Sequence, residues 1–123
     1  MNIRIKRVYE NAESADGYRV LVDRLWPRGI KKSAAALDEW AKDLAPSREL
    51  RKWYSHDPAK WHEFQQLYRK ELDKKEQLIA DLLKRADQDT VTLLFAAKDT
   101  EHNNAEVMKS FIEDNYNKPR GTS

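Results

Sequence analysis

Two short runs of apolar residues mark the centre of the predicted fold. The first is Val20-Leu21-Val22, and the second fills most of residues 90–96. Apolar side chains at successive positions indicate strands that are buried on both faces, as in the middle of a parallel sheet. Each run passes directly into a dense polar loop, at residues 23–31 and 98–104. The pattern therefore predicts two central strands, at 18–23 and 90–96, that both end in polar loops.

The N-terminal segment has a weaker strand pattern. Apolar and basic residues alternate over residues 3–7, which is typical of a strand with one buried face and predicts a position at the edge of the sheet. The acidic loop that follows, residues 10–17, is shorter than most parallel crossovers. The direction of this first strand therefore stays open.

The middle of the chain follows helical spacing. Apolar residues recur at i, i+3, i+4 and i+7 from Leu37, which predicts a helix over residues 34–44 with Ser33 as its N-cap. Ser47 should cap a short second helix. Asp57-Pro58 should start a third, because it joins an N-cap residue to a proline at the first helical position.

Two further helical segments complete the pattern. Residues 73–76 resemble a capping box and either restart a fourth helix or lie within one long bent helix. A last helix should follow the polar loop 98–104, with Ala105, Met108, Phe111 and Ile112 facing inward.

Strands that alternate with helices predict an α/β fold with a short, mainly parallel sheet flanked by helices. We expect a single small domain over residues 1–116 and a flexible C-terminal tail over residues 117–123. Ligands of such sheets bind beyond the carboxyl ends of the strands. This rule predicts that loops 23–31 and 98–104 lie at the same edge if their strands are parallel neighbours.

Composition narrows the classes of function. The chain has 123 residues, of which 40% are hydrophobic and 36% charged, and its formal net charge is +2. This near balance makes nucleic acid a second choice as partner, because nucleic-acid binding usually needs a clustered basic face. The absence of cysteine excludes disulfides and thiolate chemistry. No signal peptide or membrane-spanning run is evident, so a cytoplasmic protein without membrane contact is expected. Nothing indicates the oligomeric state.

The first polar loop carries candidate anion ligands. Arg24, Arg28 and Lys31 lie close to Gly29 in the sequence, and arginine binds phosphate or carboxylate through a bidentate fork. Asp23 either orients Arg24, acts as a general base or forms a structural salt bridge that holds the loop. Trp26 either stacks on a ring of the ligand or packs in the core.

The second polar loop carries Lys98, Asp99, His102 and Asn103 ahead of a helix N-terminus, which favours an anion. His102 is the best general acid/base candidate because histidine titrates near neutrality. The alternatives are a solvent-exposed histidine and a purely capping role for Asp99 or Thr100. A metal site made from both loops is the weaker hypothesis, since no close ligand spacing supports it.

Several of these residues also carry a family resemblance. The residues concerned form one motif, Leu21-Val22-Asp23-Arg24-Leu25-Trp26-Pro27-Arg28-Gly29, and several shorter segments, which are Trp40, 44–47, 50–51, 53–54, 56–58 and 93–99. The motif and these segments resemble the YeaO-like family of the domain of unknown function 488 superfamily. The resemblance implies no defined activity. This chain is similar to members of the wider superfamily in having an aspartate and an arginine directly after one strand. Relatives often carry cysteine and histidine in the later loop, whereas this chain has Asn103 and Asn104 there.

Two functions follow as hypotheses. The first is a small enzyme, a hydrolase or group transferase, that acts on a phosphorylated or nucleotide-like small molecule. Its catalytic residues would be Asp23, Asp99 and His102. Its substrate would be an anionic small molecule bound by Arg24, Trp26, Arg28, Lys31, His56, Lys98 and Asn103. The alternative is a non-enzymatic module that binds nucleic acid or a protein. No cofactor is identified, and the dinucleotide fingerprint G-x-G-x-x-G is absent.

Overall fold

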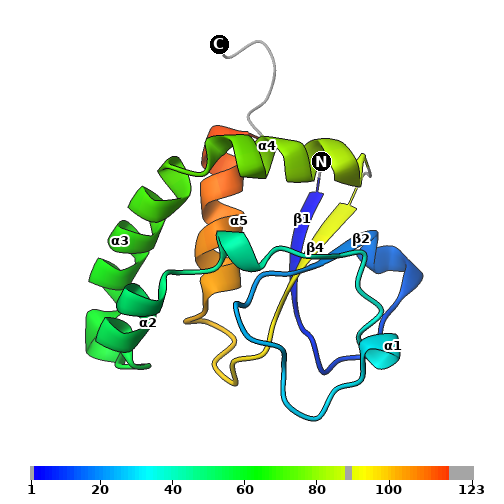
Figure 1. Cartoon of the computed structure of the whole chain (residues 1–123), viewed down its shortest axis with the longest axis horizontal. Coiled ribbons are helices and arrows are strands. Elements are labelled where there is room, and N and C mark those ends of the chain that lie inside the picture. Colours follow the sequence, from blue (N-terminus) through cyan, green and yellow to red (C-terminus); the bar gives the residue numbers. More distant parts are fainter. Residues whose placement is uncertain (1, 88–89, 117–123) are drawn as a thin grey trace.

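A computed structural model describes residues 2–87 and 90–116. Four parallel strands form one sheet in the order β1-β4-β2-β3 (Figure 1). Their bounds are Asn2–Arg7 (β1), Tyr18–Leu21 (β2), Glu39–Trp40 (β3) and Thr90–Phe95 (β4). The expected α/β class and the central positions of β2 and β4 are confirmed. The first strand lies at an edge and runs parallel to β4, which settles its direction.

Parallel pairing brings the ends of the strands together at one edge. In the register of the sheet, Leu21 of β2 lies beside Leu94 of β4, and Arg7 of β1 lies beside Phe95. The ladder continues one residue further, since Val8 N–H donates to the Phe95 carbonyl at 2.8 Å and Val22 N–H to the Leu94 carbonyl at 3.0 Å. The loops that follow the three strands therefore begin at the same rim.

The helices occupy the segments between and after the strands. Their bounds are Lys32–Ala35 (α1), Arg48–Tyr54 (α2), Trp61–Asp73 (α3), Glu76–Ala86 (α4) and Asn104–Asn115 (α5), with 3₁₀ turns at Ser14–Asp16 (η1), Lys42–Leu44 (η2) and Pro58–Lys60 (η3). In Figure 1, α1 stands apart from the other helices. Within the described residues, no helix is both long and apolar enough to cross a membrane.

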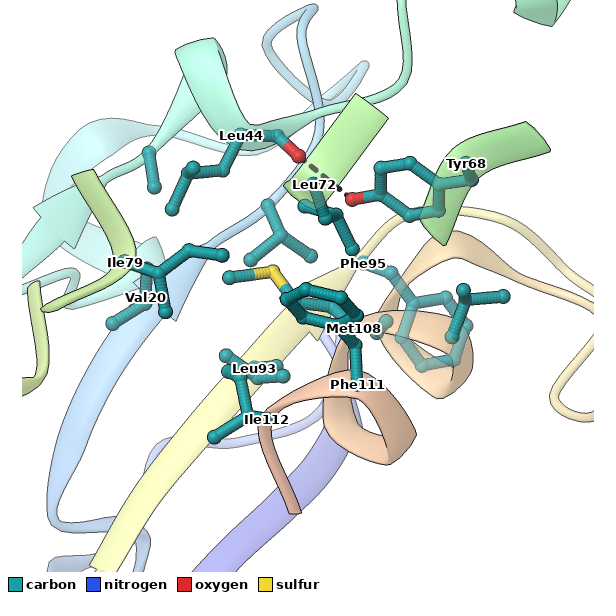
Figure 2. Close-up of a cluster of buried hydrophobic side chains, with 14 of the residues drawn as sticks. Val20, Leu44, Tyr68, Leu72, Ile79, Leu93, Phe95, Met108, Phe111 and Ile112 are labelled. Atoms are coloured by element: carbon teal, nitrogen blue, oxygen red, sulfur yellow. Dashed lines mark hydrogen bonds between the residues drawn. The ribbon is translucent and has the colours of Figure 1, made fainter. Parts of the chain in front are cut away.

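The main core lies on one face of the sheet. Val20, Leu93 and Phe95 point from the strands towards buried residues of α3, α4 and α5, such as Leu72 and Met108 (Figure 2). Tyr68 is fully buried in this core, and its hydroxyl donates to the Leu44 carbonyl at 2.7 Å. Buried apolar area is the main stabilising term of a domain of this size.

The other face of the sheet is covered by loops and contains a buried ionic cluster. Asp16 of η1 is 0% exposed, and it accepts hydrogen bonds from Lys6 of β1 and Arg19 of β2. Thr92 of β4 donates to the Asp16 carbonyl at 2.6 Å. These contacts hold the ten-residue connection from β1 to β2 against three strands, the edge strand β1 and the central strands β4 and β2. This explains how so short a connection crosses between parallel strands.

The predicted helix over residues 34–44 is wrong. The chain forms only the four-residue α1, which ends at Ala36 in a left-handed conformation (φ 49°). It then pairs with the open edge of β2, where Asp38 N–H donates to the Arg19 carbonyl at 2.9 Å and Ala41 N–H to the Leu21 carbonyl at 2.8 Å. Completing the exposed edge of a buried strand outweighed the helical spacing of the apolar residues. Ser33 is accordingly not an N-cap.

Other helix boundaries agree better with expectation. Ser47 caps α2 and Asp57 caps η3 through their side chains, as predicted. The segment from 58 to 86 is two helices, α3 and α4, but no capping box joins them, because α3 continues to Asp73 and α4 begins after Lys75. The predicted flexible tail, residues 117–123, lies outside the described residues.

Candidate functional site: a cationic cleft at the rim of the sheet

A cleft of about 1030 Å³ opens where the carboxyl ends of the strands meet. Its lining comes from three parts of the chain. These are the loop after β2, residues 23–28, then α2 with the turn that follows it, up to His56, and the segment after β4, with Ala96, Ala97 and residues 102–104. The two polar loops singled out in the sequence therefore both contribute to one concave site, together with α2.

Asp23 joins the two loops at the base of the cleft. Its Oδ2 accepts a hydrogen bond from Ala96 N–H at 2.8 Å, and its Oδ1 accepts one from the Asn104 amide at 3.2 Å. Burial raises the pKa of Asp23, although these hydrogen bonds and the charge of Arg51 act in the opposite direction. Since both carboxylate oxygens are engaged, Asp23 is well placed to fix the geometry of the rim.

The expected pair between Asp23 and Arg24 is not among the ion pairs of the described residues. Arg24 is half-buried in the wall of the cleft, and its Nε is fully buried without a hydrogen-bond partner. Arg51 of α2 is in the same condition, with a buried and unpartnered Nε. Buried polar atoms in folded proteins are nearly always paired, so two such donors in one cleft require an explanation.

Three more cations line the cleft and are exposed: Arg28 in the loop after β2, and Arg48 and Lys52 on α2. The spacing i, i+3, i+4 puts Arg48, Arg51 and Lys52 on one face of the helix. None of these α2 cations was proposed from the sequence. The spacing of the basic residues could have indicated a cationic face on this helix, but the sequence prediction relied on the apolar residues alone.

The position of α2 is fixed from its first turn. Ser47 accepts from Leu50 N–H at 3.2 Å, and both its backbone N–H and its hydroxyl donate to the Glu71 carboxylate of α3, at 2.8 and 2.5 Å. After the helix, Ser55 and His56 take left-handed conformations, with φ of 46° and 55°. These two residues turn the chain so that His56 also lines the cleft, as proposed from the sequence.

His102 and Asp99 form a hydrogen-bonded dyad at the rim. His102 Nδ1 lies 2.9 Å from Asp99 Oδ2, and the imidazole stands edge-on to Trp61 with ring centroids 5.0 Å apart. Backbone N–H groups of His102 and Glu101, together with the His102 side chain, lower the pKa of Asp99 to about 2. His102 lines the cleft, whereas Asp99 stands behind it.

The two asparagines have structural contacts that the sequence did not reveal. Asn103, not Asp99 or Thr100, is the N-cap of α5: its side chain accepts from Glu106 N–H at 3.0 Å and donates to the Asp99 carbonyl at 3.0 Å. Asn104 donates to the Val22 carbonyl at 2.6 Å as well as to Asp23. Both therefore hold the loop after β4 in place.

Trp26 lies in the wall of the cleft but is tied to the fold. Its indole N–H donates to the Ile30 carbonyl at 2.8 Å, and its ring packs edge-on against Trp40 with centroids 5.4 Å apart. Its neighbour Leu25 is 68% exposed and also lines the cleft, as does the partly exposed ring of Tyr9. These two side chains are the most exposed large hydrophobic side chains among the lining residues.

Two of the proposed ligand residues do not line the cleft. Lys31 and Lys98 are exposed and lie outside the lining residues. Among the residues that the structure describes, no three histidine, aspartate or glutamate side chains gather closely enough to hold a metal ion. Of the named candidates, Asp23, Arg24, Trp26, Arg28, His56, His102 and Asn103 are brought to the cleft.

Sequence comparison places this cleft in a family context. The family model described as "Inactive DUF488-N3 subclade" matches residues 2–123. The chain is 48% identical over 112 residues to the uncharacterized protein YeaO of Escherichia coli K12, covering 91% of this chain and 97% of that protein. It is 41% identical over 110 residues to the uncharacterized protein Rv3073c of Mycobacterium tuberculosis H37Rv, covering 89% and 92%. No solved structure matches.

Proposed function

The chain belongs to this DUF488-N3 family, and for this member we propose that the cleft binds a phosphorylated, nucleotide-like small molecule. The observation that carries the proposal is the pair of half-buried arginines, Arg24 and Arg51, whose buried Nε atoms lack a partner within the described residues. Both side chains line the cleft and are only half-buried, so a bound anion would pair with the guanidinium groups from the open side and supply the counter-charge that they lack.

Two buried cations elsewhere in the protein have a carboxylate as partner. Lys6 and Arg19 are 9% and 4% exposed, and both bind the carboxylate of Asp16. Removing one partner from such a buried pair costs about 3–5 kcal/mol, so an uncompensated buried charge is strongly disfavoured. Arg24 and Arg51 are only half-buried, and neither forms an ion pair within the described residues, so anion binding would offset a smaller cost of the same kind.

The chemistry of arginine favours phosphate as the anion. The guanidinium group is planar, remains charged and offers parallel N–H donors that match two phosphate oxygens. Charge-assisted hydrogen bonds of this kind are about twice as strong as neutral ones. The exposed apolar surfaces of Leu25 and Tyr9 at the same cleft support a ligand that also has a ring or other apolar part.

Turnover is a second candidate, which the dyad of Asp99 and His102 favours. The Asp99 carboxylate would hold the Nδ1 proton of His102, leaving Nε2 to give or take a proton at a bound ligand. Two features speak for binding alone. The matched family is described as inactive, and Asp23, the other candidate base, has both carboxylate oxygens engaged.

Ligand binding is best tested by thermal unfolding and isothermal titration calorimetry. We expect AMP or a sugar phosphate to stabilise the protein and adenosine or the free sugar not to do so. At a ligand concentration of 100 Kd the stabilisation should be about 2.7 kcal/mol. Arg24→Ala and Arg51→Ala should each abolish this stabilisation by the ligand, because each removes one of the two half-buried guanidinium groups.

Matched controls separate a site from general charge. Lys70→Ala and Lys84→Ala remove exposed cations of α3 and α4 that do not line the cleft, and they should leave binding unchanged. Equal loss of binding in these controls, or no binding of any phosphorylated probe, would refute the proposed function. Mass spectrometry would detect conversion of a bound probe to a product. Conversion by the native protein but not by His102→Ala would support an enzymatic function.

The binding of nucleic acid is distinguished by its salt dependence. A protein that neutralises several backbone phosphates loses affinity steeply as salt rises. Tighter binding of an oligonucleotide than of any mononucleotide, with an affinity that grows with its length, would favour that alternative over a small-molecule site.

A further inference from the structure

We infer that the ligand presents at least two negatively charged groups to the cleft at once, one to an inner pair of cations and one to an outer set. This inference rests on the proposed function and narrows it to polyanions such as a nucleoside diphosphate. The inner pair is Arg24 and Arg51, and the outer set is Arg28, Arg48 and Lys52.

The charge of the lining residues exceeds what a single phosphate can balance. Five lining side chains are arginine or lysine, and one, Asp23, is acidic. A single phosphate group carries a charge of about −1.5 to −2 at neutral pH. Such a group would leave the cleft clearly positive, although the chain as a whole is nearly balanced at +2. The excess positive charge is a local feature of this cleft.

The five cations divide into two sets by their exposure. Arg24 and Arg51 are half-buried and have buried Nε atoms, so they form the less exposed set. Arg28, Arg48 and Lys52 are exposed and form the outer set. A phosphate held by the inner pair would be partly desolvated, and a second group attached to it would extend towards the exposed cations.

The outer cations lie on two segments of defined position, α2 and the loop after β2. Arg48 and Lys52 are one turn apart on α2, about 6 Å along the helix axis, and they flank Arg51 on the same face. In the loop after β2, the Arg28 carbonyl accepts from the Tyr9 hydroxyl at 2.9 Å, which ties that loop to the end of β1. The outer cations are therefore carried on anchored backbone.

The ion pairs of the described residues involve other cations than the five that line the cleft. The ion pairs of the described residues involve Arg4, Lys6, Arg19, Arg69, Arg85 and His102. No cleft arginine or lysine takes part in one, within that part of the chain. All five remain available to a ligand.

Calorimetry at fixed ionic strength tests the inference with orthophosphate, pyrophosphate, AMP and ADP as probes. Each charge-assisted hydrogen bond contributes enough for about tenfold in affinity or more. We therefore expect pyrophosphate and ADP to bind at least about tenfold more tightly than orthophosphate and AMP. The double substitution Arg48→Gln with Lys52→Gln should lower this ratio severalfold, because Arg28 is then the one cation of the outer set that remains.

Every outcome of this experiment is informative. Equal affinities for AMP and ADP would overturn the two-group inference while leaving the proposed function intact. A ratio that survives the Arg48→Gln/Lys52→Gln change would also overturn it. No binding of any probe would refute the proposed function itself. The double substitution Lys70→Gln with Lys84→Gln removes the same charge outside the cleft, and a matching fall in the ratio there would assign the preference to net charge alone.

Discussion

Replacing Asp16 with asparagine tests the buried ionic cluster that holds the connection between β1 and β2. Asp16 is 0% exposed, and its carboxylate accepts from Lys6 Nζ at 3.2 Å, from Glu13 N–H at 3.0 Å and from Arg19. Asparagine preserves the shape of the side chain but removes its charge. Two buried cations would then lose their shared counter-charge.

The expected loss of unfolding free energy is about 3–5 kcal/mol, the usual cost of removing one member of a buried ion pair. Remaining contacts set the lower part of that range. Lys6 keeps Glu13 at 2.7 Å, and Arg19 keeps the carbonyls of Ala35 and Ala36 at 2.9 and 3.0 Å. Since domains are typically stable by about 5–15 kcal/mol, the variant should fold but unfold at markedly lower urea concentration.

Glu13→Gln is the matched control, because Glu13 pairs with the same lysine but its side chain is 63% exposed. Exposed pairs contribute about 0–1 kcal/mol. Urea unfolding followed by tryptophan fluorescence gives both values. A loss below about 1 kcal/mol for Asp16→Asn, or equal losses in the two variants, would show that the cluster does not hold this connection.

The same cluster predicts a pH profile. Burial alone would raise the pKa of Asp16, but hydrogen bonds from the Glu13 backbone, Lys6 and Arg19 outweigh it and hold that pKa below its usual value. The stabilisation by ionised Asp16 is therefore present above its unfolded pKa, near 3.9, and is lost as pH falls through the lower folded value. Asp16→Asn should lack this acid transition.

Two further changes have outcomes that the structure distinguishes. Gly17→Ala should cost more than about 2 kcal/mol in urea unfolding, whereas Gly29→Ala should cost about 1 kcal/mol. Both glycines have positive φ, but only a Cβ at Gly17 would clash with a neighbour, the Thr90 carbonyl. Similar losses in the two variants would contradict this. His102→Ala should leave the pKa of Asp99, about 2 in the native protein, well below its ordinary value in a carboxylate NMR titration, because backbone N–H groups are the largest cause. A return to the ordinary value would assign the shift to the imidazole instead.

The central strands could be predicted because their burial leaves a pattern in a short stretch of the sequence. Val20-Leu21-Val22 and the run through Leu93 and Leu94 are apolar at successive positions, and a segment buried on both faces leaves that pattern whatever surrounds it. The rule that ligands bind beyond the carboxyl ends of parallel strands then placed the two polar loops at one rim, where they do lie.

Features that depend on distant partners were missed. The stretch around Trp40 has helical spacing, but the free edge of β2 decides its conformation, and the Trp40 indole N–H donates to the Asp23 carbonyl at 2.7 Å. The role of Asn103 as N-cap depends on where α5 begins, which sequence spacing defines only within a few residues. The contribution of Arg51 to the cleft depends on how α2 docks through Ser47 on Glu71.

The binding of an anion between Arg24 and Arg51 is tested most directly by ¹H–¹⁵N spectra of the arginine Nε–H groups during titration with pyrophosphate. We expect the resonances of Arg24 and Arg51 to move, because both side chains line the cleft and a bound anion would change the charge beside each Nε. Those of Arg69 and Arg85, which already bind Asp114 and Glu39, should stay in place. Unchanged Arg24 and Arg51 resonances at millimolar pyrophosphate would contradict the account.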